Sequence, residues 1–540
     1  MSDGVEATGS GGLKRLRGAS PVAVLVLAIG SWALTACGSG DGGGGGDRPP
    51  AATDAPNIIL VVTDDQPLAS FNPQALPTVF SEVVEPGTNF SEAAVAVPLC
   101  CPSRATMITG QYAHNHGIFD NDPGYETLRD PGQTLPVWLQ QAGYLTGHFG
   151  KWLHGYEDVA GADPAPGWDR WVTQLEPRLY YDYELSIDGE VRSYGGSRRD
   201  YLTKVISDEA SSWVRRRAGE RPLYVQLDFY APHGAGPHRK QTASCRRSAE
   251  PPLADFDAAD AVELPSPPSY NEADVSDKPG FYQELPPLTD SDTETIEEQY
   301  RCAVASLAAA DRGFADLLEA LRETGELEDT AFIFVSDNGY FLGEHRMGAP
   351  QERNLKQRPL EPTIHVPLAL RLPAALAPGP VPSRVDLQVS LADIAPTVLE
   401  LAGAEPCVEG ECRVIDGRSL VGLASGERRG WPRDRAVLFE YDAFAPDVGG
   451  PTASCAYAGL RTAGSFYVRH TEVPGPDGCG PVEEPVIEYY DLLRDPFQLE
   501  NLAGADPRSR AGATEEQLAE RLDALIECAG SDEAAVRPCE

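Results

Sequence analysis

Acidic and amide side chains follow two apolar segments of this 540-residue chain. Asp64 and Asp65 come directly after the first segment, and Asp337 and Asn338 come directly after the second. Adjacent buried carboxylates repel each other unless a cation neutralises them. All four residues offer oxygen ligands, which favour Ca²⁺ or Mg²⁺, and no thiolate–imidazole spacing typical of zinc accompanies them. The pattern predicts a site for a divalent cation; the alternative is that both pairs only open turns.

A second candidate for chemistry is the stretch VPLCCPSRATMITGQYAHNHG, which begins at residue 97. Pro102 suits the first turn of a helix and Gly110 its end. Cys100 would then lie at a helix N-terminus, where free N–H groups and the helix dipole favour anions. Arg104 would add a permanent charge and a forked donor. We expect a thiol in this setting to have a lowered pKa and to be reactive; the alternative is a buried cysteine pair.

Three apolar segments would position these groups. They read NIILVVTDD from residue 57, PLYVQLDFYAPH from residue 222 and AFIFVSDNG from residue 331. Each has a β-branched or aromatic core without strict alternation, which is typical of a strand buried on both faces of a sheet. In open α/β sheets, ligands bind beyond the carboxyl ends of the strands. We therefore expect an α/β fold with a large parallel or mixed sheet between helices, and one site that joins the acids to His233.

The rest of the chain is predicted to add helices and a small second sheet. Apolar spacings of three, four or seven predict a helix over about 293–324 and another over 386–401. The proline- and acid-rich segment 251–288 is expected at the surface, and 419–434 is expected to be a linker. Short strands in AVLFEY, SFYVRH and IEYYDLLRDP, with a helix over 514–528, predict a smaller C-terminal α+β subdomain.

The N-terminus has the pattern of an export signal. Basic residues precede an apolar run over 21–34 that is too short for an ordinary membrane span. The run ends in LTACG, which resembles a bacterial lipoprotein box with Cys37 as the lipidated first mature residue. The alternative is an ordinary signal peptide cut near Ala36. We expect an exported cell-envelope lipoprotein on the outer face of a bacterial membrane, which contacts the membrane only through the lipid on Cys37.

The charge balance narrows the class of partner. The chain has 44 Lys and Arg against 82 Asp and Glu, for a net charge of −38. This excludes nucleic acid as an expected partner, because a phosphate backbone requires a basic surface.

The segment Cys100-Cys101-Pro102-Ser103-Arg104 fits the Cys-x-Pro-Ser-Arg signature of the type I sulfatases, and Thr109-Gly110 extends the match. The segments GKWLHGY, NEADVSDKP, SDNGYFLGEHR and YYDLLRDPFQLENL look most like the N-acetylglucosamine-6-sulfatase and extracellular sulfatase branch. The resemblance runs from about residue 57 to 502. It implies an alkaline-phosphatase-like fold and hydrolysis of sulfate monoesters of carbohydrates, such as N-acetylglucosamine 6-sulfate, or of aryl groups.

The resemblance also implies a role for individual residues. Cys100 would be oxidised to formylglycine by a formylglycine-generating enzyme, and one divalent cation, Ca²⁺ favoured over Mg²⁺, would be held there. The implied metal ligands are Asp64, Asp65, Asp337, Asn338 and the modified Cys100. The implied catalytic residues are Cys100, Arg104 beside it, Lys151 and Lys356 at the sulfate, and His233 at the leaving oxygen.

The sequence departs from the family pattern in places. Many arylsulfatases carry a histidine two residues after the Gly-Lys lysine, where this chain has Leu153. His154 follows, and we expect it to be either the base of the second step or a substrate contact. Weaker candidates for substrate contact are His114, His116, His345 and Arg346. For His114 and His116 the alternative is a structural role.

The eleven cysteines divide into modified residues, one free thiol and four expected disulfides. Of eleven, Cys37 and Cys100 are reserved, and Cys101 is expected to be an unpaired thiol. Sequence proximity, among 105 possible connectivities, suggests the disulfides Cys245–Cys302, Cys407–Cys412, Cys455–Cys479 and Cys528–Cys539.

The expected organisation is a signal peptide over 1–36, a glycine-rich tether over 37–56, a catalytic domain over 57–425, a C-terminal subdomain over 426–530 and a tail over 531–540. Two other functions stay open at this point. One is a phosphonate or phosphodiester hydrolase with the same scaffold and modified residue, and the other is a catalytically silent carbohydrate-binding lipoprotein.

Overall fold

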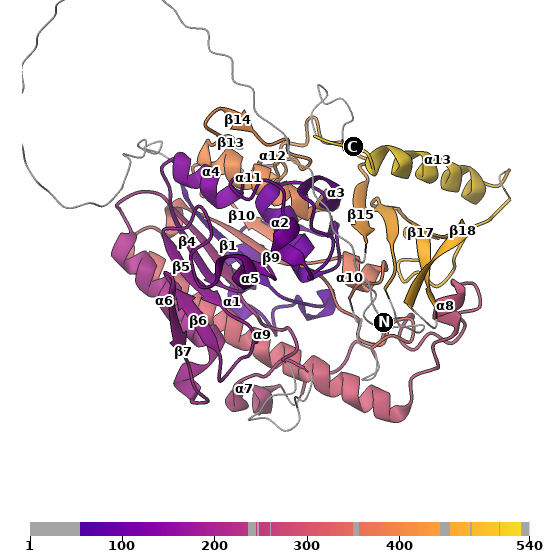
Figure 1. Cartoon of the computed structure of the whole chain (residues 1–540), viewed down its shortest axis with the longest axis horizontal. Helices are drawn as coiled ribbons and strands as arrows, with labels where there is room; N and C mark the ends of the chain where they lie inside the picture. The colour runs from indigo at the N-terminus through magenta and orange to yellow at the C-terminus, as the bar shows by residue number, and fades with distance from the viewer. Residues whose placement is uncertain are drawn as a thin grey trace, which may run out of the picture. The chain divides into compact units, whose positions relative to one another are not determined.

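The three segments predicted as buried strands are neighbours at the centre of one sheet (Figure 1). They form β1 (Asn57–Thr63), β8 (Leu223–Asp228) and β9 (Thr330–Ser336), and β1 pairs in parallel with both of the others. This computed structural model describes residues 55–235, 245, 248–259, 261–348, 356–442, 454–475, 478–506, 508–530 and 539. The predicted signal peptide, Cys37 and most of the tether and tail lie outside the described residues.

The sheet has ten strands in the described chain and is mixed, as predicted. Five adjacent strands at its centre are parallel, and antiparallel strands extend it on both sides. The strands, in the order in which they neighbour one another, are β11 (Arg384–Val385), β2 (Thr88–Phe90), β10 (Leu368–Arg371), β9, β1, β8, β4 (Leu145–Gly150), β5 (Arg170–Gln174), β6 (Glu184–Ile187) and β7 (Glu190–Ser193).

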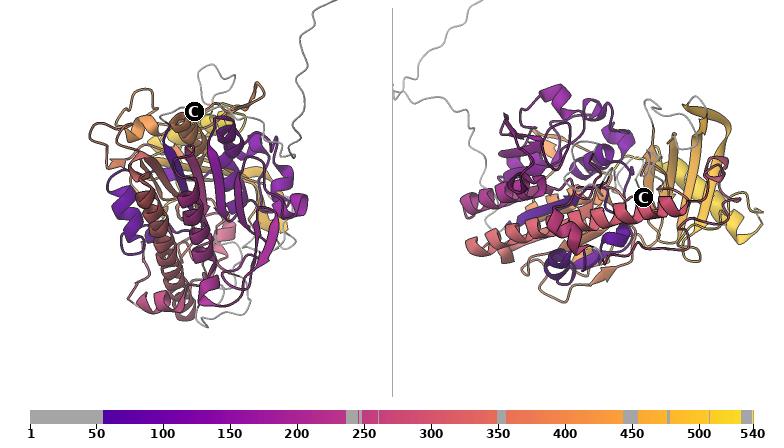
Figure 2. Two further views of the ribbon diagram at one scale, coloured as in Figure 1. Left: turned by 90° about the vertical axis from the view of Figure 1, so that its left-hand side faces the viewer. Right: turned by 90° about the horizontal axis from the view of Figure 1, so that it is seen from below.

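Helices cover both faces of this sheet (Figure 2). Alternate side chains of β1 enter different cores: Ile58 packs with one face and Ile59 with the other. Successive side chains of a strand point to opposite faces, so a strand without polar alternation is stable only when both faces are covered. Helices α2 (Cys100–Thr109), α4 (Leu135–Gln141) and α11 (Ile394–Ala402) contribute to the first core, and α1 (Pro77–Val79), α6 (Leu202–Arg217) and α9 (Asp290–Thr324) to the second.

The two long predicted helices fare differently. The helix predicted over 293–324 is confirmed as α9; it begins earlier because Thr289 and Asp292 form a capping box, and Gly325 ends it with a φ of +80°. The prediction of a helix from residue 386 is wrong over its first two turns. There β12 (Val389–Ser390) pairs with β3 (Ala93–Ala94), and α11 begins only at Ile394.

A second, four-stranded antiparallel sheet follows, as predicted. It consists of β15 (Val437–Tyr441), β16 (Tyr457–Arg461), β17 (Ser465–Gly475) and β18 (Gly478–Asp491), and α13 (Arg510–Leu525) packs on one face. Its other face, with Phe439 and Phe466, joins the core of the large sheet. The prediction of a linker over 419–434 is wrong, because α12 (Val421–Ala424) lies there and Leu420 and Leu423 are buried.

The four predicted disulfides are confirmed, and Cys101 is a buried free thiol like Cys100. In the part of the chain that the structure describes, no helix has the length and apolar character needed to cross a bilayer. The remaining elements are α3 (Ala113–His116), α5 (Tyr156–Ala160), α7 (Leu253–Ala258), α8 (Gly280–Gln283), α10 (Glu361–Ile364), β13 (Cys407–Val408) and β14 (Glu411–Cys412).

Candidate active site

The carboxyl ends of four neighbouring parallel strands bring polar side chains together. Asp64 follows β1, Asp337 follows β9, Asp228 ends β8 and Lys151 follows β4. The register aligns these ends: Thr63 is opposite Ser336, and Asp228 is opposite both Val62 and Gly150. The sheet therefore places residues from four distant parts of the sequence at one edge.

A glycine allows β4 and β8 to end side by side. Gly150 has a φ of +127°, and a Cβ at this position would lie 1.8 Å from the carbonyl oxygen of Asp228. Only glycine combines this backbone angle with such a close approach. The Gly-Lys pair of the sequence is thus needed to bring Lys151 to the site.

Cys100 begins helix α2, as the sequence predicted, and it is fully buried, as in the alternative of a buried cysteine pair. Its Sγ lies 3.5 Å from Oδ1 of Asp64 and 2.8 Å from Nζ of Lys356. The expectation of an acidic thiol is wrong: burial, together with the charge of Asp64, raises the pKa of Cys100 to about 11. The unmodified side chain is therefore a neutral thiol. The evidence for a functional role of Cys100 is its position between Asp64 and Lys356, not the acidity of its thiol.

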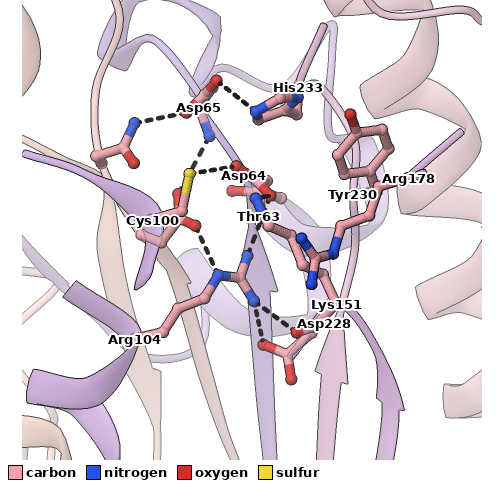
Figure 3. Close-up of polar contacts among 12 residues, drawn as sticks. Thr63, Asp64, Asp65, Cys100, Arg104, Lys151, Arg178, Asp228, Tyr230 and His233 are labelled. Carbon is pink, nitrogen blue, oxygen red and sulfur yellow. Dashed lines mark hydrogen bonds and ion pairs between the residues drawn. The ribbon is translucent and has the colours of Figure 1, made fainter. Parts of the chain in front are cut away.

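Asp64 and Asp65 lie close to Cys100 (Figure 3). Asp64, Asp65, Cys100 and His233 offer ligand atoms that all lie within 4.8 Å of one another. Oδ1 of Asp337 accepts from the backbone N–H of Asp65 at 3.2 Å, and Nδ2 of Asn338 donates to Oδ1 of Asp65 at 2.7 Å. The five residues predicted from the sequence as metal ligands are thus brought together.

This group of side chains fits a divalent cation. Oδ1 of Asn338 is buried and has no hydrogen-bond partner among the described residues, although buried amide oxygens are normally paired. Burial and the charge of Asp64 also raise the pKa of Asp337 to about 6. A bound cation would supply a partner for this unpaired oxygen and would offset the repulsion that disfavours ionisation of the neighbouring carboxylates.

Three cationic side chains face the same carboxylates. Lys151 forms an ion pair with Asp64, and Nζ of Lys356 lies 2.6 Å from Oδ1 of Asp65. Arg104 donates to Oδ2 of Asp337 at 2.8 Å. Burial disfavours the charged form of Asp64, but these cations, Lys151 foremost, hold its pKa below the usual range. The site can therefore bind a tetrahedral anion next to Cys100.

The two histidines named from the sequence differ in their surroundings. Nε2 of His233 lies 3.5 Å from Oδ2 of Asp65, and its Nδ1 lies 2.7 Å from the carbonyl of Gly234. Burial lowers the pKa of His233 to about 4. Nδ1 of His154 lies 3.1 Å from the guanidinium of Arg178, and burial, then Arg178, lowers the pKa of His154 well below its usual value.

Asp228 and His148 are part of this site, and the sequence analysis missed both. Oδ1 of Asp228 accepts from Arg104 at 3.0 Å, and its Oδ2 lies 3.0 Å from Nε2 of His148. Both side chains are fully buried, and the ring of His148 packs among Trp152, Trp168 and Trp171. The available signal was a lone acid, Asp228, at the end of an apolar strand. A carboxylate at such a position is buried only when it has a partner, so a nearby cation could have been expected.

The four weaker candidates bind protein groups. His114 lies 2.8 Å from Oε1 of Glu440, and the fully buried His116 lies 3.1 Å from the hydroxyl of Thr106. Nδ1 of His345 lies 2.6 Å from Oε2 of Glu272. Arg346 donates to the carbonyls of Glu272, Leu285 and Ala273. These contacts stabilise loops and the C-terminal segment, and none of them involves the residues around Cys100.

Comparison with known proteins agrees with this geometry. The sulfatase family profile matches residues 56–404 of the chain. The chain belongs to the sulfatase family. It is a sulfuric ester hydrolase, and the expected alkaline-phosphatase-like fold and the resemblance to the N-acetylglucosamine-6-sulfatase branch are confirmed.

Individual relatives of this sulfatase are distant. Human N-acetylglucosamine-6-sulfatase is 27% identical over 487 residues, which cover 84% of this chain and 82% of the human protein. An arylsulfatase of Volvox carteri is 32% identical over 68% of this chain and 59% of its own. The fold matches that of BT4656, solved in complex with its substrate D-glucosamine-2-N,6-O-disulfate, with a TM-score of 0.66, 21% identity and coverage of 87% of this chain and 97% of that one.

We predict that Asp228→Asn lowers the kcat of this sulfatase about 10- to 100-fold, because Arg104 would lose a charged hydrogen-bond partner and shift from Asp337. Steady-state kinetics on a sulfate ester measures the effect. The control is Asp208→Asn, which removes an exposed ion pair with Lys204. Equal kcat values for both variants would contradict a role for Asp228 in holding Arg104.

We also predict a pH-dependent contribution of His114 to stability. Burial disfavours the charged imidazolium, but Glu440 outweighs it and raises the pKa of His114 to about 9. A group whose pKa rises on folding stabilises the folded state fully below its unfolded pKa, about 6.5, and this contribution is lost as the pH rises through the folded value. The Tm difference between wild type and His114→Gln should be large at pH 6 and shrink by pH 10. A constant difference would contradict the ion pair.

Proposed function

We propose that this chain hydrolyses 6-O-sulfate esters of glucosamine-type sugars, with formylglycine derived from Cys100 and one divalent cation, Ca²⁺ favoured over Mg²⁺. The observation that supports it is the position of Cys100, between Asp64 and Lys356 and in one group of possible ligands with Asp65. Asp65 in turn accepts from Asn338, whose Oδ1 has no partner among the described residues. The proposed cation ligands are Asp64, Asp65, Asp337, Asn338 and the modified Cys100.

Once oxidised and hydrated, Cys100 would supply a hydroxyl nucleophile toward sulfur, and the cation would lower the pKa of that hydroxyl and offset charge on the sulfuryl oxygens. The residues of the chain prepare this reaction. Lys151 and Lys356 bind the sulfuryl oxygens with ammonium groups that are already in place, so little reorganisation is needed as charge develops. Arg104 holds Asp64 and Asp337 at their spacing.

Proton transfer completes the proposed reaction. Lys356 is the group that can deliver a proton to the departing sugar oxygen. His233, whose pKa burial lowers to about 4, is a neutral contact for that oxygen. Burial disfavours the ammonium of Lys356, but Asp65 outweighs it and raises the pKa of Lys356, so this lysine is protonated on arrival of the substrate. In a second step the remaining hydroxyl of the modified Cys100 would lose its proton, the bond between that carbon and the sulfate oxygen would break, and sulfate would leave as the aldehyde reforms. His154 either accepts that proton or contacts the sugar.

The choice of sugar draws on the relatives. Human and goat N-acetylglucosamine-6-sulfatases resemble most of this chain, and BT4656 was solved with a 6-O-sulfated glucosamine. We propose that the enzyme is exported, is lipidated at Cys37, and requires a formylglycine-generating enzyme in its host.

The conversion of Cys100 is tested with two variants of adjacent residues. Cys100→Ala should abolish turnover of N-acetylglucosamine 6-sulfate, whereas Cys101→Ala, the matched control, should retain it. The thiol of Cys101 donates to the carbonyl of His154 and packs in an apolar core, and the substitution leaves the backbone N–H that donates to Asn121 unchanged. Mass spectrometry of the wild-type peptide should show a mass about 18 Da below that of cysteine, as thiol-to-aldehyde conversion requires. Full turnover by Cys100→Ala, or faster wild-type turnover of a phosphodiester than of the sulfate, would contradict the proposal.

Removal of the cation should stop turnover and lower the Tm, because an ion that binds only the native state stabilises it by mass action. The measurement is thermal unfolding and sulfate release after treatment with a chelator and desalting, followed by titration with Ca²⁺ or Mg²⁺. We expect Ca²⁺ to restore the Tm and the turnover at a lower concentration than Mg²⁺ does. The Asn338→Ala variant should require a higher concentration of either ion than wild type. A chelated protein with unchanged Tm and turnover would contradict the metal site.

A further inference from the structure

A second polar cluster lies beside the candidate active site; of its members only His154 was named from the sequence, and the comparisons assign none of them. It consists of Arg178, Glu176, Glu157 and His154. Nη1 of Arg178 forms an ion pair with Glu176 and lies 3.1 Å from Nδ1 of His154, and its Nη2 lies 3.4 Å from Oε1 of Glu157. We call these four residues the Arg178 cluster.

The Arg178 cluster is close to the reacting centre. His154 lies three residues after Lys151 in the segment between β4 and α5, and its carbonyl accepts from the thiol of Cys101 at 3.8 Å. Nζ of Lys151 lies 5.6 Å from the ring centre of Tyr230, and the charge of Arg178 acts on the same tyrosine. Figure 3 draws Arg178 and Tyr230 with the side chains around Cys100. A sugar whose sulfate reached Lys151 would have its ring near this cluster.

Hydrogen-bond chemistry defines what the cluster offers. A guanidinium only donates, and Nη1 of Arg178 lies 3.1 Å from Nδ1 of His154 and 3.4 Å from its Nε2. The shorter distance favours Nδ1 as the acceptor and Nε2 as the nitrogen that carries the proton of the neutral ring. Nε of Arg178 is buried without a partner among the described residues. Arg178 is only 6% exposed, so its charge is stabilised mainly by the ion pairs with Glu176 and Glu157.

The charges of the cluster select against a second anion. Two carboxylates face one guanidinium, and the carboxylate side is the more accessible: the side chain of Glu176 is 49% exposed, that of His154 24% and that of Arg178 4%. A second sulfate here would meet Glu176 first and be repelled. A hydroxyl or amide N–H would instead donate to Glu176, and a neighbouring hydroxyl oxygen would accept from His154.

We infer that the Arg178 cluster is a subsite for the uncharged polar groups of a sugar ring, with Glu176 as acceptor and His154 as donor. This inference rests on the proposed function and narrows it, because such a subsite favours sulfated carbohydrates over aryl sulfates, which lack hydroxyl groups at this distance. It also assigns His154 to substrate contact, since its accepting nitrogen is taken by Arg178.

The test compares two substrates and two variants. For wild type, Glu176→Gln and Glu190→Gln, kcat/KM is measured on N-acetylglucosamine 6-sulfate and on 4-nitrophenyl sulfate. Loss of the charged acceptor should lower the sugar-to-aryl ratio of kcat/KM about 10-fold or more in Glu176→Gln. Glu190 is the matched control because its side chain is 79% exposed on β7 and forms an ion pair with the exposed Arg192. The ratio for Glu190→Gln should equal that of wild type.

Several outcomes would overturn the inference. One is an equal loss on both substrates in Glu176→Gln, and another is no loss on either. A third outcome uses glucosamine 2-N,6-O-disulfate as an additional substrate. If Glu176→Gln raised kcat/KM for this sugar relative to N-acetylglucosamine 6-sulfate, a second anion would occupy the subsite.

Saturation-transfer NMR with unsulfated N-acetylglucosamine separates this inference from the proposed function. Binding that is weaker in Glu176→Gln than in wild type supports the subsite even if no sulfate ester is turned over, and that result would refute only the function. Equal binding by the two proteins would refute the subsite.

Discussion

The arrangement of the site depends on one guanidinium. Arg104 donates to Asp337, Asp228 and the carbonyl of Lys151 and lies 3.4 Å from Asp64, so it contacts the ends of β9, β8, β4 and β1 at once. Its donors have a fixed planar geometry, so a single side chain sets the spacing of four strand ends. Burial disfavours its charge, but the three carboxylates outweigh this and raise its pKa. Together with Lys151 and Lys356, this cation offsets the repulsion among the acids.

The small C-terminal sheet also helps to build the site. Tyr457 of β16 donates to the carbonyl of Gln357 at 3.0 Å, directly after Lys356. Arg461 of the same strand lies 2.6 and 2.9 Å from the two carboxylate oxygens of Glu361. The segment that carries Lys356 is therefore held from the side of the second sheet. The two sheets share one core, and the C-terminal sheet helps to position Lys356, which contacts Cys100.

A strongly acidic protein that binds an anion needs local compensation. The net charge of −38 acts weakly at the site, because salt screens charges beyond about 8–10 Å. Within that distance Arg104, Lys151 and Lys356 face the carboxylates, and these cations decide what the site attracts. At the Arg178 cluster the balance is reversed in favour of carboxylates. The two neighbouring regions thus suit the two ends of a sulfated sugar, a charged ester and a neutral ring.

Local patterns in the sequence were sufficient for much of this protein. The buried strands, the helix that begins at Cys100 and the long helix up to Gly325 depend on residues near one another in the chain, as does the run of acids after β1. Asp228, His148 and Arg178 were missed, the thiol of Cys100 was predicted to be acidic, and a helix was begun too early at residue 386. Each of these depends on neighbours far away in the sequence: the pKa of a thiol follows from its burial and from Asp64, and the role of an acid at a strand end follows from the cation packed against it. Residue types and spacing determined the fold class and the family, whereas only the tertiary structure decided which charges meet, because electrostatic and packing energies depend on distance in space.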